Sequence, residues 1–225
     1  MQQHFTQEVE NLRTNIIKMA SLVDEMFERA ISSAEIGTPE VSKLLKAKDL
    51  EVDAYDNLIQ TQCENILAIF QPFASDLRFM ISAMMINNQL ERCGDITVNI
   101  ARRLKKIGVD NKLVPESKII EMASKAKGML VLAIDSFIHS NSAIAYQVLE
   151  KDAEVDKFNK SIFKYSTEKM KTDAELIIPG THLVVLARQI ERLADHTTNI
   201  AENVIFSLEA RLMTHTRRIK KKDSE

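Results

Sequence analysis

Apolar residues recur along most of the chain at alternating steps of three and four positions, which is the spacing of one face of an α-helix. The first run begins at Phe5 and continues through Leu12 and Ile16 until Gly37 interrupts it. Pro39 suits the first turn of the next helix, because a backbone N–H is not needed there. The predicted helices cover about residues 5–36, 39–71, 75–107, from 119 onward, 142–171 and 181–213.

The same sequence pattern occurs twice. Residues 91–103 read ERCGDITVNIARR, and residues 191–203 read ERLADHTTNIAEN. A second motif, KDLEVD at 48–53, returns as KDAEVD at 151–156. Because both motifs return in the same order, we infer an internal duplication. The sequence therefore predicts an all-α protein whose six long helices form two tandem, duplicated three-helix bundles.

The boundary between the repeats falls at residues 108–117, where glycine, proline, Asp and Asn interrupt two strongly periodic regions. We predict a first repeat over residues 1–108, a second over 116–216 and a basic tail over 217–225. The tail could touch a membrane surface or a partner, although a solvated terminus is the more ordinary interpretation.

The composition is that of a globular helical protein. Hydrophobic residues make up 45% and charged residues 28%, with only five glycines and four prolines. The net charge of -2 gives no reason to expect nucleic acid as a partner. No apolar run approaches the roughly 18 residues of a membrane helix, so we expect a cytoplasmic protein without membrane insertion. Cys63 and Cys93 fall at core-like helical positions and are expected to be reduced.

Acidic residues stand in pairs four positions apart in both repeats. Residues at that spacing share a helix face and lie about 5 to 6 Å apart, where like charges repel by a few tenths of a kcal/mol. Helix stability therefore does not account for the pattern, whereas a ligand role does. The candidate ligands are Asp49, Asp53, Glu91, Asp95 and Asn99 in the first repeat, and Asp152, Asp156, Glu191, Asp195, Asn199 and Glu202 in the second.

If the second and third helices of each bundle are neighbours, each repeat assembles one cluster of carboxylates. Oxygen donors select hard cations such as magnesium, manganese, calcium or ferric iron, and they argue against a thiolate-type zinc site. A solvated acidic surface is the plain alternative, but the corresponding placement of the pairs in both repeats favours metal. Arg102 and Arg103 replace Glu202 and Asn203, so we expect the second site to bind metal better.

Catalytic motifs are missing from the sequence. A di-iron carboxylate bundle uses Glu-x-x-His motifs, and none of the histidines has a glutamate three positions before it. There is no glycine-rich phosphate loop, nucleophile motif or cysteine cluster either. His196 could be a metal ligand or could pair with Asp195. We therefore expect a protein that is not an enzyme, with a metal-storing or metal-dependent oxidase bundle as the alternative.

These motifs resemble the phosphate-uptake regulator family, PhoU, over nearly the whole chain. The likeness rests on QPFASDLR at 71–78, LERCGDITVNIA at 90–101, QIERLADHTTNIAENV at 189–204 and the two KDxEVD segments. The resemblance implies a cytoplasmic six-helix protein built as two three-helix bundles. It also implies metal clusters, of iron, manganese or magnesium, bound through the Glu/Asp-x-x-x-Asp motifs.

The resemblance further implies a regulatory role. A PhoU-like protein links the phosphate-specific ABC transporter to a membrane sensor histidine kinase and keeps the phosphate-starvation response off when phosphate is plentiful. We accordingly expect an adaptor that acts as a homodimer. The chain departs from the family at Arg102 and Arg103, which bears on the first metal site, and its second repeat has no counterpart of PFASDLR.

Overall fold

The computed structural model describes residues 2–36, 40–108 and 112–213. Over these ranges the regular secondary structure is entirely helical, which confirms the predicted all-α class. These ranges contain six long helices, a short helix and one 3-10 turn. The elements are α1 (Gln2–Ile36), α2 (Val41–Phe70), α3 (Ala74–Ile107), α4 (Leu113–Glu116), α5 (Ile119–Ile138), α6 (Ser142–Thr172), η1 (Ala174–Leu176) and α7 (Ile177–Glu209).

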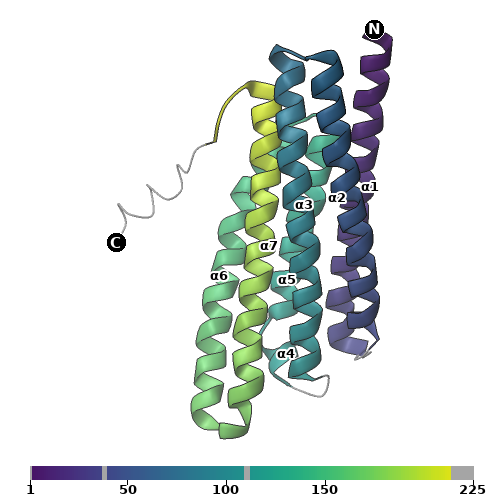
Figure 1. Ribbon diagram of the computed structural model, residues 1–225. Helices are drawn as coiled ribbons and strands as arrows, with labels where there is room; N and C mark the ends of the chain where they lie inside the picture. The colour runs from purple at the N-terminus through teal and green to yellow at the C-terminus, as the bar shows by residue number, and fades with distance from the viewer. Residues whose placement is uncertain (1, 37–39, 109–111, 214–225) are drawn as a thin grey trace.

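The long helices form two three-helix bundles that lie side by side (Figure 1). α1, α2 and α3 contact one another, and so do α5, α6 and α7. The bundles meet mainly where α3 packs against α7, and α1 also contacts α5. The predicted arrangement is therefore confirmed. The third helix of each repeat, which carries the duplicated ERxxDxTxNIA pattern, is the helix that faces the other repeat.

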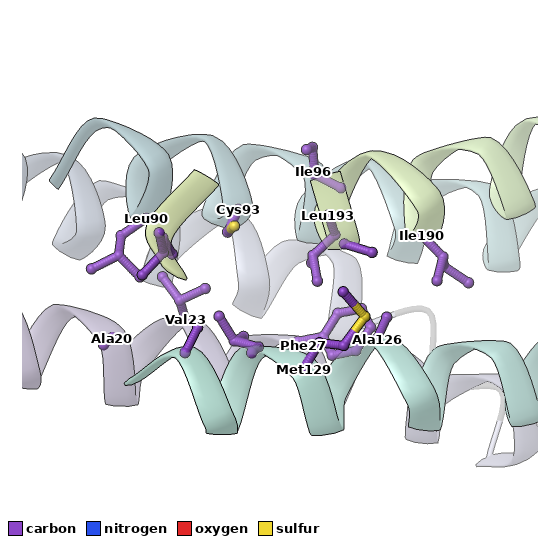
Figure 2. Close-up of a cluster of buried hydrophobic side chains, with 14 of the residues drawn as sticks. Ala20, Val23, Phe27, Leu90, Cys93, Ile96, Ala126, Met129, Ile190 and Leu193 are labelled. Carbon is purple, nitrogen blue, oxygen red and sulfur yellow. The ribbon is translucent and has the colours of Figure 1, made fainter. Parts of the chain in front are cut away.

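The core lies where the two bundles meet. Figure 2 shows Val23 and Phe27 of α1, Cys93 of α3, Met129 of α5 and Leu193 of α7 gathered in one interior. All five side chains have an exposed fraction of 0%. The apolar stripes predicted from the sequence thus bury against both their own bundle and the neighbouring one, which removes a large apolar area from water.

The start of α7 corrects the predicted sixth helix. That prediction placed the helix after Pro179 and Gly180, but α7 begins at Ile177 and includes both residues. Proline is tolerated in a first helical turn because its missing N–H would have no partner there in any case. The helix ends at Glu209 and not at Met213, since Ala210 adopts a left-handed conformation with φ of 55°.

The second helix also differs slightly from its prediction. α2 begins at Val41 after the cap residue Glu40, and it ends at Phe70, where Gln71 turns left-handed with φ of 47°. The predicted helix start at Thr38 and Pro39 lies outside the described residues. The same holds for the basic tail over 217–225.

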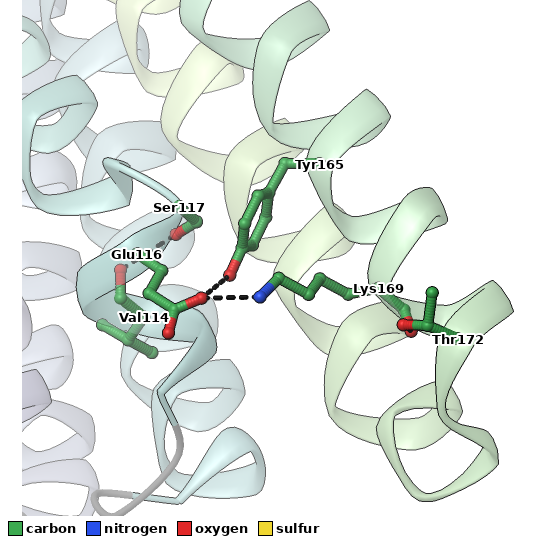
Figure 3. A network of polar contacts seen from close by, with 6 residues as sticks. All are labelled: Val114, Glu116, Ser117, Tyr165, Lys169 and Thr172. Carbon is green, nitrogen blue, oxygen red and sulfur yellow. Dashed lines mark hydrogen bonds and ion pairs between the residues drawn. The ribbon is translucent and has the colours of Figure 1, made fainter.

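The predicted linker contains a short helix, α4. Leu113 and Val114 are buried, and the carboxylate of Glu116 accepts hydrogen bonds from Tyr165 Oη and Lys169 Nζ of α6, both at 2.8 Å. Figure 3 shows these two side chains converging on Glu116. The segment between the repeats thus includes one helical turn, because two buried apolar residues attach it to the second bundle. Among the described helices, none has the length and apolar composition needed to cross a bilayer.

Candidate functional site

The first repeat brings its predicted carboxylates together on neighbouring faces of α2 and α3. Burial, together with the nearby charges of Asp95 and Asp53, raises the pKa of Asp49 to about 6. Burial and the charge of Asp95 likewise raise the pKa of Glu91. Because each of these groups destabilises the charged form of its neighbour, the four predicted carboxylates form one electrostatic cluster.

Asp56 is an additional member that the sequence analysis missed. Its charge raises the pKa of Glu91, and its Oδ1 accepts a hydrogen bond of 2.6 Å from the buried Asn87 Nδ2 of α3. Asp56 follows Asp53 by three positions, so it continues the acidic stripe of α2. That spacing was the available signal, and the buried Asn87 orients this carboxylate towards α3.

A glycine allows α2 and α3 to come close at the cluster. A Cβ atom built on Gly94 would lie 3.3 Å from Asp49 Oδ1 and 3.3 Å from Val52 Cγ1. Both distances are shorter than ordinary van der Waals contacts of a side chain. The missing side chain of Gly94 therefore lets Asp49 reach the surface of α3, where Glu91 lies about one turn before the glycine and Asp95 directly follows it. Ala194 occupies the corresponding position of the second repeat.

The two arginines that distinguish the first repeat have different surroundings. Arg102 lies near the cluster: its charge lowers the pKa of Asp49, and its Nη1 donates to Asn99 Oδ1 at 3.3 Å. Asn99, a predicted ligand, thus accepts a hydrogen bond from a cation. Arg103 turns away from the cluster towards α7, where its Nη1 lies 3.2 Å from Nδ1 of His182.

In the second repeat, Asp152 and Asp156 lie on α6, and Glu191 and Asp195 lie on α7. Glu191 forms an ion pair with Arg188, one turn before it on the same helix. The two repeats therefore each place one arginine against a predicted ligand, Arg102 in the first and Arg188 in the second. The predicted advantage of the second site over the first stays a prediction.

Two further predicted ligands, Asn199 and Glu202, line a surface hollow between α3 and α7. Asn199 Nδ2 donates to Gln89 Oε1 of α3 at 3.1 Å. His196 Nδ1 contacts the same oxygen at 2.8 Å, so His196 pairs with Gln89. Burial and the charges of Arg92 and Arg192 lower the pKa of His196, which favours the neutral ring as the donor to this oxygen.

The donor set suits a hard cation, although the side chains are not arranged as a coordination shell. In the described part of the chain, no group of three or more His, Cys, Asp or Glu side chains lies close enough to hold a metal ion. The chemistry of the first cluster nevertheless fits such an ion, because burial and the charges of Asp53 and Asp95 raise the pKa of Asp49 and Glu91, and a bound cation would stabilise the charged carboxylates. Asp49, Asp53, Glu91 and Asp95 are the residues that would hold it.

The cysteines are structural. Both thiols are buried, and burial raises the pKa of Cys63 and of Cys93 to about 12. A thiol with such a pKa supplies very little thiolate at neutral pH and is a poor nucleophile. Neither cysteine is therefore a candidate nucleophile.

Sequence comparison places this architecture among known proteins. The family model of the PhoU domain matches the chain twice, over residues 16–104 and 119–204. The chain belongs to the PhoU family. Each match spans the helices of one bundle, so the duplication inferred from the sequence corresponds to two copies of the family's domain.

Individual PhoU relatives resemble the chain over nearly their whole length. A phosphate-specific transport system accessory protein PhoU homolog of Caulobacter vibrioides is 28% identical over 95% of this chain and 93% of its own length. The homolog of Streptococcus pneumoniae is 29% identical over 92% of this chain and 95% of its own. The two alignments therefore cover more than nine-tenths of this chain and of each relative.

Solved PhoU structures share the fold. The crystal structure of PhoU from Pseudomonas aeruginosa has a TM-score of 0.85 and 28% sequence identity, covering 92% of this chain and all of its own. The phosphate transport system regulatory protein PhoU from Streptococcus pneumoniae has a TM-score of 0.86 and 27% identity, covering 93% of this chain. This PhoU-family chain accordingly has a role in the regulation of phosphate transport.

Proposed function

We propose that the protein is a negative regulator of the phosphate-starvation response, acting as an adaptor between the phosphate-specific ABC transporter and a sensor histidine kinase. The observation that carries the proposal is the double match to the PhoU domain over both bundles, together with relatives named as accessory proteins of phosphate-specific transport. The sequence lacks a catalytic motif, so the protein acts by contact and not by catalysis.

The carboxylate clusters fit this role as cation-binding surfaces. In the first repeat, burial and the neighbouring carboxylates disfavour the charged forms of Asp49 and Glu91, and a bound iron, manganese or magnesium ion would offset this cost. We propose that bound metal stiffens the α2–α3 and α6–α7 pairs and thereby fixes the surfaces that partners contact. Protein that acts on transporter and kinase in this way works on the cytoplasmic side of the membrane, and we propose a homodimer as its working form.

Apolar side chains at one end of the first bundle offer a surface for such contacts. Phe73, between α2 and α3, is 81% exposed, and Ile69 near the end of α2 is 70% exposed. Leu77, one turn into α3, is 38% exposed. Three apolar side chains at the same helix junction form a patch of the kind that protein partners cover. Phe73 and Leu77 belong to the QPFASDLR segment, which has no counterpart in the second repeat.

Deleting the gene tests the regulatory role. We expect phosphate-starvation genes to be expressed in high phosphate in the deletion strain, and we expect the wild-type gene to restore repression. Unchanged expression of these genes in the deletion strain would contradict the proposed function.

A substitution at the exposed patch tests the mode of action. Phe73→Ser removes an exposed aromatic side chain without disturbing the core, so the helical content and melting temperature should stay close to wild type. We expect the variant to fail to restore repression. Phe163→Ser, which changes an exposed phenylalanine of α6 in the other bundle, is the matched control and should restore it.

A further inference from the structure

Three basic side chains meet at one end of the boundary between α3 and α7. Arg103 and Lys106 lie in the last turns of α3, and His182 lies in the second turn of α7. Arg103 Nη1 is 3.2 Å from His182 Nδ1. Burial lowers the pKa of His182, and the charges of Arg103 and Lys106 lower it further. Arg103 and Lys106 are thus close enough to His182 to disfavour a positive charge on its ring.

No anionic side chain offsets this group within the described residues. Neither Arg103 nor Lys106 forms an ion pair there, and no carboxylate contributes to the shifted pKa of His182. Basic residues in a last helical turn commonly complement the helix dipole, which accounts for Lys106 and its neighbour Lys105. The dipole does not account for Arg103, whose guanidinium is half-buried and directed at a histidine of the other bundle.

The duplication shows that the packing does not require this chemistry. Asn203 stands where the first repeat has Arg103, and Ser82 stands where the second repeat has His182. The same helix pair therefore accepts two neutral residues at the opposite end of the boundary. The pair of basic residues therefore occurs at one end of the α3–α7 boundary and not at the equivalent positions of the other end.

We propose that Arg103, Lys106 and His182 form a binding site for a phosphoryl oxyanion, with free inorganic phosphate as its ligand. Guanidinium, ammonium and imidazolium groups are the side chains that bind such anions in proteins. Because the donors come from both bundles, the anion would link α3 to α7. The site adds a ligand to the proposed regulatory role, but it rests on the side-chain geometry, so its binding test and the deletion test can fail independently.

The contact between Arg103 and His182 defines the protonation linked to binding. Arg103 is always a donor, so the neutral His182 accepts at Nδ1 and carries its proton on Nε2. A bound dianion favours the imidazolium form. Binding therefore raises the pKa of His182, and phosphate binds more tightly as the pH falls through that pKa.

Titration of the histidine ring protons by NMR measures this linkage. The protein has five histidines, so His182 can be assigned from the spectrum of His182→Gln. At constant ionic strength, inorganic phosphate should raise the pKa of His182 by about one pH unit, the size of effect expected from one neighbouring opposite charge. His196 is an internal control, because arginines also lower its pKa but its Nδ1 is held by Gln89.

Arg103→Asn, which installs the residue found in the second repeat, separates binding from a merely structural role. Without phosphate, the variant should show a higher pKa at His182 than wild type, since one repelling cation is gone. With phosphate, the further rise should be less than half that of wild type. Arg92→Asn, which changes an arginine near His196, should leave the phosphate response of His182 intact.

A second experiment distinguishes free phosphate from the phosphate group of a lipid. In it, wild type and Arg103→Asn are sedimented with phosphatidylglycerol vesicles in the absence of free phosphate. A response of His182 to free phosphate supports the proposed ligand. Vesicle binding that Arg103→Asn abolishes, with no response to free phosphate, would transfer the site to a lipid headgroup and overturn the assignment of inorganic phosphate. No response to either, or an equal response at His196, would overturn the site itself.

Discussion

The helices of the two repeats are arranged alike, but the glycine that contacts the second helix of each repeat lies at a different point of the third helix. In both, a buried threonine of the third helix donates to the carbonyl four residues before it, at 2.8 Å for Thr97 and 2.9 Å for Thr197. In the first repeat, α2 approaches α3 at Gly94, beside the carboxylates. In the second, α6 approaches α7 at Gly180, in the first turn of α7. The glycine contact beside the acidic residues thus occurs in the first repeat, where the second repeat has Ala194.

The polar contacts between the bundles also differ. Gln89 Oε1 is engaged by His196 and Asn199 of the other bundle. The corresponding Gln189 has a buried Oε1 without a hydrogen-bond partner, and Ile96 stands in the place of His196. The two repeats thus share their apolar packing, while their polar residues at the boundary differ. Different chemistry in the two halves is therefore expected of the carboxylates too.

Filling the close contact of the second repeat should give the largest effect. A Cβ atom on Gly180 would lie 2.7 Å from Met170 Cγ and 3.1 Å from Ser166 Oγ. Gly180→Leu should therefore destabilise the protein by about 3 kcal/mol, as overpacking does. Gly128, with no atom within 4 Å of its Cβ position, is the control: Gly128→Ala should stabilise α5 by roughly 0.5–1 kcal/mol. Urea unfolding of both variants checks the difference, and equal stabilities would refute the close packing of α6 on α7.

The same substitution at the two equivalent glutamines should have opposite consequences. Gln89→Met leaves His196 Nδ1 and Asn199 Nδ2 without their acceptor and should cost about 1–3 kcal/mol. Gln189→Met removes an unpaired buried oxygen, so its effect should range from neutral to about 1 kcal/mol of stabilisation. Thermal and urea unfolding of both variants measure the two changes in stability. A larger loss for Gln189→Met than for Gln89→Met would invert the comparison.

The sequence predicted the parts of the structure that repeat along one helix. The apolar stripes through Val23, Cys93 and Leu193 are buried as their spacing indicated, and the acidic pairs of α2 and α3 do lie together. Helical periodicity indicates which residues share a face, so the apolar stripes and the acidic pairs could be predicted from the sequence. It does not state which residue of another helix lies opposite.

The contacts that the sequence did not predict all join helices distant in the chain. The engagement of His196 by Gln89 and the approach of Arg103 to His182 depend on how far α3 and α7 slide along each other. Asp56 was missed because its role depends on Asn87 of the neighbouring helix. The short helix α4 follows from two apolar residues that are too few to give a periodic signal.

Removing charge from the first cluster should give the smallest effect, with a defined pH dependence. The folded state raises the pKa of Asp49 from 3.8 to about 6, so it favours the protonated form. Stability therefore falls as the pH rises through this window, and without metal Asp49→Asn should be more stable than wild type at pH 7. The gain should be a few tenths of a kcal/mol, because the group is partly exposed and screened by solvent, and it should vanish near pH 4.

Glu51→Gln is the matched control for that experiment, since it removes one charge from an exposed position of the same helix. Melting curves of both variants from pH 4 to pH 7 without metal give the comparison. A gain for Asp49→Asn that does not change with pH would mean that the folded state does not raise the pKa of Asp49.

Metal-dependent melting of wild type, Asp95→Ala and Asp195→Ala tests most directly whether the duplicated carboxylates are cation sites. Each variant removes one carboxylate from the corresponding position of its repeat. With manganese or ferric iron at a hundredfold excess over the dissociation constant, a bound site contributes about 2.7 kcal/mol. We predict that metal raises the melting temperature of wild type, that Asp195→Ala loses the contribution of the second site, and that Asp95→Ala loses less because Arg102 already lies at the first cluster. Equal melting of all three proteins, unchanged by either metal, would contradict metal binding and show that the repeated acidic stripes are solvated surface.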